Sequence, residues 1–210
     1  MGLVVLLATC GSAMSQVKPA SSRVPEGVNV LRDLAYVQNG HERNCLDLYL
    51  PKKTDGLLPV IVWIHGGAWQ AGSKDRCPAV AFATRGFAVA SINYRLSQHA
   101  VFPAQIEDCK AAIRWLRGKA AQYNLDANHI GVWGASAGGH LVALLGTSGS
   151  VKEWDARGEH REQSSRVQCV VDWFGPSNLA SMGGSHGDVR AELNEQDPAL
   201  HALLQEMWGR

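Results

Sequence analysis

The feature that most constrains the fold is a series of short apolar runs separated by segments with helical periodicity. A continuous run of β-branched and aromatic residues indicates a strand that is buried on both faces. Such strands, when they alternate with helices, are typical of a mainly parallel sheet with helices on both faces. The expected strands are residues 60–64, 87–92, 130–133 and 167–174, and the expected helices are residues 75–84, 103–123 and 137–145.

Two more strands are expected before this series. Residues 34–37 and 45–50 flank the dipeptide Asn39-Gly40, which is a strong signal for the turn of a β-hairpin. They should add an antiparallel N-terminal hairpin to the sheet. Residues 151–166 are polar and charged, and they predict a surface loop with no core pattern.

Length and charge restrict the domain organisation and the partners. The chain has 210 residues, which suits one α/β domain, here expected over residues 30–210. Its 20 Lys and Arg nearly balance its 19 Asp and Glu, for a formal net charge of +1. That charge provides no long-range field to attract nucleic acid or an anionic membrane.

The first residues predict export. Residues 1–15 are mostly apolar and end in small residues, and they are too short for a bilayer, which needs about 20 residues. With Ala13-x-Ser15 as a cleavage site, they predict a signal peptide, and therefore a secreted or periplasmic protein without stable membrane insertion. Residues 16–29 predict a polar linker. Two alternatives are a lipoprotein box at Cys10, which Thr9 makes a poor match, and a first core strand.

The cysteines leave disulfide pairing open. Without the leader an even number remains, which permits disulfides in an oxidising compartment but does not fix their pairing. Cys109 and Cys169 lie in apolar patterns and predict buried free thiols. The sequence contains no CxxC motif and no cluster of His and Cys, so a structural zinc site is not expected. The cysteines in question are Cys45, Cys77, Cys109 and Cys169.

The pentapeptide Gly134-Ala135-Ser136-Ala137-Gly138 lies between an expected strand and an expected helix. This is the context of a G-x-S-x-G nucleophile elbow, in which a serine sits on a sharp, strained turn. Side chains two positions before and after the serine would collide there, and the two glycines remove that collision. The pattern therefore predicts a reactive serine at the N-terminus of a helix.

A second glycine-rich loop, His65-Gly66-Gly67-Ala68-Trp69, directly follows the expected strand at 60–64. Small residues here let backbone N–H groups face a pocket, where one pre-set donor to a developing oxyanion is worth about 3 kcal/mol of barrier. His65 is expected to brace this loop by hydrogen bonding rather than to act as a general base. Trp69 either lines an acyl pocket or packs.

With both motifs in place, the chain resembles an α/β-hydrolase esterase of the branch with an HGG[GA]W loop, which includes bacterial feruloyl and acetyl-xylan esterases. The resemblance implies that Ser136 is the nucleophile and that the amides of Gly67, Ala68 and Ala137 are oxyanion donors, with no metal or organic cofactor. It spans roughly residues 30–180. The matching stretches are residues 46–51, 65–69, 91–96, 102–117, 130–145 and 170–176.

The triad acid and histidine of such an esterase are not evident. In this family the order is Ser, then Asp or Glu, then His, on two further βα units of about 30 residues each. Only residues 175–210 follow the last expected strand, with one helical stretch at 199–208. The sequence therefore predicts an incomplete α/β-hydrolase fold, inactive by itself toward activated esters, and marginally stable because the sheet ends at an uncovered strand.

Local substitutes for these two residues are weak candidates. Asp172 lies at the end of the last strand, and His186-Gly187-Asp188 resembles an acid motif but follows no apolar strand. His140 lies one turn after the serine and should point away from its oxygen. His160 and His201 fall on polar or terminal segments.

The leading interpretation is hydrolysis of a carboxylic ester, either small or polysaccharide-linked, through an acyl-enzyme on Ser136. Two alternatives remain open at this point. One is a non-catalytic hydrolase-like binding module, and the other is a peptidase on the same fold. The acyl and alcohol groups of the substrate and the oligomeric state are not readable from the sequence.

Overall fold

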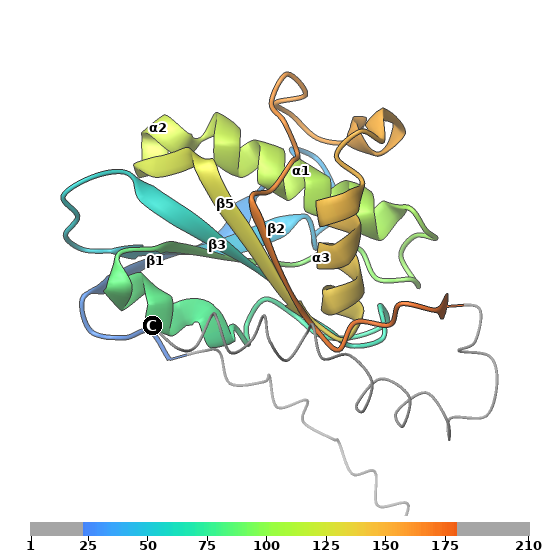
Figure 1. Cartoon of the computed structure of the whole chain (residues 1–210), viewed down its shortest axis with the longest axis horizontal. Coiled ribbons are helices and arrows are strands. Elements are labelled where there is room, and N and C mark those ends of the chain that lie inside the picture. The colour runs from blue at the N-terminus through green and yellow to red at the C-terminus, as the bar shows by residue number, and fades with distance from the viewer. Residues whose placement is uncertain (1–22, 180–210) are drawn as a thin grey trace, which may run out of the picture.

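The computed structural model describes residues 23–179 and is built around a central β-sheet. Within these residues the sheet has six strands in the spatial order β1-β2-β4-β3-β5-β6. Strands β4, β3, β5 and β6 are parallel, whereas β2 is antiparallel to both β1 and β4. The expected mainly parallel sheet with an N-terminal antiparallel hairpin is confirmed (Figure 1). The strands are β1 (Val28–Ala35), β2 (Cys45–Pro51), β3 (Leu58–Ile64), β4 (Ala88–Ile92), β5 (Leu125–Ala135) and β6 (Cys169–Trp173).

Helices cover both faces of the sheet, because successive side chains of each buried strand point to opposite sides. On β3, Val62 and Ile64 join a core with Ile113 and Leu141, whereas Trp63 joins a second core with Val80. Helices α1 and α3 cover the first face, and the 3₁₀ helix η1 covers the second (Figure 1). The helices are η1 (Pro78–Arg85), α1 (Ala104–Gly118), α2 (Ala120–Tyr123), α3 (Ala137–Thr147) and η2 (Lys152–Asp155).

Two helices differ from the sequence prediction in their extent. The single helix expected over 103–123 is interrupted at Lys119, whose backbone leaves the helical region at φ −98° and ψ 7° and separates α1 from α2. The helix expected from residue 75 begins only at Pro78, because proline is favoured in a first turn. It ends as expected at Gly86, which has φ 86°.

The segment after α3 is anchored, which corrects the expectation of a plain surface loop at 151–166. Three cations on α1 donate hydrogen bonds to its backbone carbonyl groups. Lys110, whose side chain is fully buried, reaches Ser148 O at 2.9 Å and Val151 O at 2.8 Å. Arg114 binds Arg157 O, and Arg117 binds the carbonyls of Ser164 and Arg166. These contacts cannot be predicted from the sequence, because the acceptors are backbone carbonyl oxygens, which every residue has.

The described cysteines, Cys45, Cys77, Cys109 and Cys169, are all free thiols. Cys109 is buried, as expected, and burial raises the pKa of its thiol. Cys169 is exposed, which contradicts the expectation of a buried thiol. The reason is its position at the start of β6, which in residues 23–179 pairs only with β5.

Several predictions fall on residues outside the described range. These are the signal peptide, most of the linker, the helical stretch at 199–208, and the residues His186, Asp188 and His201. The linker boundary needs one correction, because Val28 and Asn29 already belong to β1. Between residues 23 and 179, none of the helices combines the length and the hydropathy that crossing a membrane requires.

Candidate functional site

Ser136 occupies a sharp corner between β5 and α3. Its backbone has φ 55° and ψ −121°, a strained conformation for a residue other than glycine, which costs about 1–3 kcal/mol. The corner is held from both sides: the Ser136 N–H donates to Trp173 O at 2.9 Å, and the His140 N–H donates to Ser136 O at 3.0 Å. Ser136 is half-buried, so its hydroxyl is not sealed in the core.

The two glycines that flank this corner have the steric role that the sequence predicts. A Cβ added to Gly134 would collide with the backbone of Gly138. A Cβ added to Gly138 would collide with Ile64 O and would lie 2.7 Å from His65 O. The start of α3 therefore packs directly on the end of β3, so closely that no side chain fits at Gly138.

The loop at residues 65–69 runs beside Ser136. A Cβ added to Gly66 would lie 2.6 Å from Ala135 O and 3.1 Å from Ser136 Cβ, so the loop backbone touches the serine corner. Gly67, Ala68 and Trp69 all have positive φ angles of 114°, 52° and 58°. The structure thus brings together the two glycine-rich motifs that are separated by about seventy residues in the sequence.

His65 braces this loop as a neutral imidazole. A carbonyl only accepts and a guanidinium only donates. The 2.7 Å contact of Nδ1 with Gly66 O therefore requires a proton on Nδ1, and the 3.1 Å contact of Nε2 with Arg43 requires none on Nε2. Burial, together with the nearby Arg43, lowers the pKa of His65 to about 4, and its ring stacks on Tyr94. Both ring nitrogens are engaged, which supports a bracing role.

The lowered pKa of His65 predicts loss of stability in acid. In the unfolded chain this group titrates near pH 6.5, whereas in the folded protein its pKa is about 4. Between these two values the unfolded state binds the extra proton, so the free energy of unfolding decreases as the pH falls. From pH 7 to pH 5 this group should remove about 2 kcal/mol, measured by urea unfolding.

The matched control for this prediction is His65→Asn, which keeps an amide donor beside Gly66 O but does not titrate. Its free energy of unfolding should depend less on pH than that of the unmodified protein, by the same amount. Equal pH dependence in the two proteins would contradict the assignment of this titration to His65.

The other candidate residues bind backbone groups or pack against other side chains. Asp172 faces the start of α3, and its Oδ1 accepts the Gly175 N–H at 2.9 Å. The ring of His140 meets Trp69 edge-on at 5.3 Å, and burial lowers the pKa of His140. Trp69 is partly buried against the main core. His160 lies far from Ser136 along the chain, against Gly118 at the end of α1.

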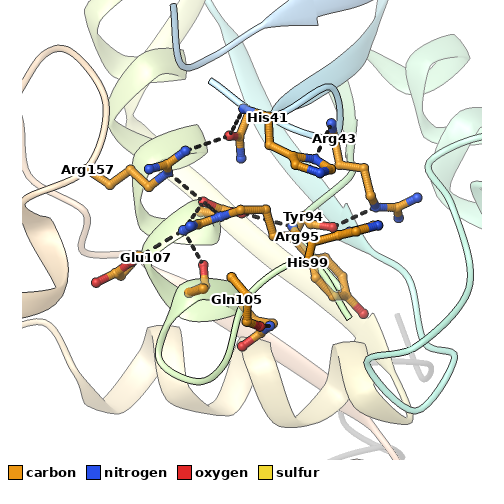
Figure 2. A network of polar contacts seen from close by, with 12 residues as sticks. His41, Arg43, Tyr94, Arg95, His99, Gln105, Glu107 and Arg157 are labelled. Carbon is orange, nitrogen blue, oxygen red and sulfur yellow. Dashed lines mark hydrogen bonds and ion pairs between the residues drawn. The ribbon is translucent and has the colours of Figure 1, made fainter. Parts of the chain in front are cut away.

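Two residues that hold the loop lack a signal from spacing or composition. Arg43, in the connection from β1 to β2, donates from Nε to Tyr94 O at 2.8 Å (Figure 2). The Tyr94 hydroxyl donates to His65 O at 3.0 Å. Tyr94 falls within the stretch 91–96 that resembles the esterase family, and this resemblance is the signal that could have identified it. Arg43 precedes the first matching stretch.

The arrangement contains no group of three or more His, Cys, Asp or Glu side chains suited to a metal ion within residues 23–179. What it offers instead is a half-exposed serine hydroxyl beside a strained loop with small residues. These are the parts that nucleophilic attack on a carbonyl and stabilisation of an oxyanion require.

Solved structures with similar architecture include a carbohydrate esterase. A truncated form of a carbohydrate esterase from gut microbiota superposes with a TM-score of 0.69 at 38% identity, covering 74% of this chain and 59% of that one. A bifunctional GH43-CE of Bacteroides eggerthii gives a TM-score of 0.66 at 42% identity, covering 70% of this chain and 21% of that one.

Sequence relatives agree with the structural ones. The chain is 33% identical over 173 residues to the esterase LipC of Mycobacterium tuberculosis, covering 75% of this chain and 41% of LipC. It is 32% identical over 156 residues to the probable isoprenylcysteine alpha-carbonyl methylesterase ICMEL2 of Arabidopsis thaliana, covering 73% and 36%. The chain spans less than half the length of these two relatives. Because the BD-FAE family pattern matches residues 46–207, and because the sheet has the expected order, the chain belongs to the BD-FAE family of α/β-hydrolases.

Proposed function

We propose that the protein hydrolyses carboxylic esters through an acyl-enzyme on Ser136. The observation that carries this proposal is the strained Ser136 corner lying directly against the loop of Gly66, Gly67 and Ala68. In the first step the Ser136 oxygen attacks the ester carbonyl carbon while a histidine takes the hydroxyl proton. The alcohol then leaves with that proton, and water attacks the acyl-enzyme to release the acid.

The backbone amides of Gly67, Ala68 and Ala137 are proposed to hold the negative oxygen of the tetrahedral intermediate. Two features support this assignment. Gly67 and Ala68 are exposed and directly follow Gly66, which lies against the Ser136 corner. Ala137 is the first residue of α3, where N–H groups have no partner within the helix. Donors that are fixed before the reaction need no reorganisation when charge develops.

The histidine and the acid of the triad are proposed to lie outside residues 23–179. Within that range the Ser136 hydroxyl has no hydrogen bond to a histidine. His65 is engaged at both ring nitrogens. The rings of His41 and His99 lie 4.4 Å apart in a tilted arrangement, and the Nδ1 atom of each accepts a backbone N–H. His129 pairs with Asp126 near the start of β5, at the opposite end of that strand from Ser136.

Carbohydrate-linked esters are the proposed substrates. The support is the similarity to the carbohydrate esterase of gut microbiota and to the bifunctional GH43-CE protein. Export, proposed from residues 1–15, would give the enzyme access to such substrates outside the cytoplasm.

The test compares hydrolysis of p-nitrophenyl acetate by the 210-residue chain and by a protein that includes whatever reading frame follows codon 210. Ser136→Ala should reduce the hydrolysis rate of whichever of the two proteins is active by a factor of about 10⁴ or more. Activity that survives Ser136→Ala would refute the nucleophile. If the 210-residue chain hydrolyses the ester at a normal rate and Ser136→Ala abolishes this activity, the triad histidine must lie within the 210 residues.

A further inference from the structure

The oxyanion loop, defined as residues 65–72, holds a conformation that needs external support. Ala68 and Trp69 have positive φ angles although neither is a glycine. Each such residue costs about 1–3 kcal/mol, and the strain persists only where surrounding contacts over-determine the backbone. Part of the support is internal, because the N–H groups of Gln70 and Ala71 each donate to Gly67 O at 2.9 Å.

The two ends of the oxyanion loop lie against each other. A Cβ added to Gly72 would collide with Gly66 O and would lie 2.5 Å from His65 Nδ1. The residues between them therefore form an almost closed ring, whose shape depends on how His65 and Gly72 are held together.

A single guanidinium joins these two ends. Arg43 Nη2 donates to Gly72 O at 2.9 Å and to His65 Nε2 at 3.1 Å. Its Nε donates to Tyr94 O at 2.8 Å (Figure 2). The Tyr94 ring stacks on His65, with the ring centres 4.5 Å apart. The planar fork of arginine suits several acceptors fixed in one plane, which a lysine ammonium does not reproduce.

The partners of Arg43 distinguish it from its neighbours. Arg95 and Arg157 both pair with the buried carboxylate of Asp108. For Arg43, no ion pair is found in the described part of the chain, and its four hydrogen-bond acceptors are uncharged groups. Its guanidinium is thus directed to the oxyanion loop and its support, rather than to charge balance.

We propose that Arg43 is a positioning residue that clamps the oxyanion loop by joining His65 to Gly72 and by fixing His65 as its Nδ1–H tautomer. That tautomer lets Nδ1 donate to Gly66 O, at the point where the loop touches Ser136. The catalytic role of this clamp rests on the proposed function. The effect of Arg43 on the loop conformation does not, so the loop conformation and the esterase activity are tested by different measurements.

The experiment measures the loop directly, in the full chain, by NMR. In the unmodified protein the ¹⁵N shifts of the His65 ring should report a single Nδ1–H tautomer. In Arg43→Met the ring should become a mixture of tautomers. The amides of Ala71 and Ser97, which bond to Gly67 O and Trp69 O, should exchange with solvent about tenfold faster, because a charge-assisted hydrogen bond is lost.

Arg85→Met is the matched control, because Arg85 is an exposed arginine at the end of η1, over the Phe82 ring. It should leave the His65 tautomer and both exchange rates unchanged. If Arg43→Met does not fold, Arg43→Lys replaces it, with the same changes expected because the fork is lost. A retained tautomer with unchanged exchange in either Arg43 variant would overturn the proposal. Absence of esterase activity from both proteins of the proposed-function test would count against the proposed function, but it would not affect this measurement.

Discussion

Gly138→Ala is expected to lower the free energy of unfolding by about 3 kcal/mol or more. The added Cβ would collide with Ile64 O and approach His65 O to 2.7 Å, and both are backbone atoms that cannot rotate away. In a helix without such contacts, alanine would be more favourable than glycine by about 1 kcal/mol, so the measured loss understates the clash. Urea unfolding followed by far-UV circular dichroism at pH 7 measures the change.

Gly56→Ala is the control for this substitution. A Cβ at Gly56 meets nothing within 4 Å, and its φ is not in the region reserved for glycine. The variant should change stability by less than about 0.5 kcal/mol, or stabilise slightly by restricting the unfolded chain. If Gly138→Ala behaved like Gly56→Ala, the close packing of α3 on the end of β3 would be wrong, and with it the geometry of the Ser136 corner.

The second large effect is expected at Asp108. Its side chain is fully buried, binds the Arg95 guanidinium through both oxygens at 2.9 Å, and pairs with Arg157 Nε at 3.1 Å. It also accepts the Arg95 backbone N–H at 2.9 Å. Asp108→Ala would leave two guanidinium groups without this partner, which costs about 3–5 kcal/mol. The measurement is again urea unfolding at pH 7.

Glu107→Ala provides the comparison within the same network. Glu107 also pairs with Arg95, at 3.3 Å, but its side chain is 26% exposed and solvent screens the interaction. This variant should lose no more than about 1 kcal/mol. Similar losses in the two variants would show that burial does not decide the strength of these ion pairs.

The sequence predicts the parts of the fold that local chemistry decides. The parallel strands follow from continuous apolar runs, whereas β1 covers Val28–Ala35 rather than the expected residues 34–37. The position of Ser136 follows from the two flanking glycines, although the atoms that exclude a side chain at Gly138 belong to Ile64 and His65. The role of His65 as a brace could likewise be predicted, since it directly precedes a glycine-rich loop.

The features that escaped prediction depend on contacts between distant segments. Arg43 donates only to backbone atoms and neutral side chains far along the chain, and such acceptors leave no mark on a sequence pattern. Cys169 looks buried because its neighbours are apolar, but β6 has a partner on one side only in the described residues. Lys119 ends α1 within a segment whose apolar spacing continues to Tyr123, since periodicity does not register a backbone break.

The way α1 holds the segment after α3 bears on how this surface changes in evolution. Lys110, Arg114 and Arg117 grip mostly carbonyl oxygens, and every amino acid supplies one of those. Between residues 148 and 166, homologues are therefore free to exchange most side chains while the path of the segment stays the same. Asp155, which pairs with two of the cations, and Arg157, which pairs with Asp108, are exceptions. Sequence divergence should therefore concentrate in residues 148–166, whereas Lys110, Arg114 and Arg117 should be conserved.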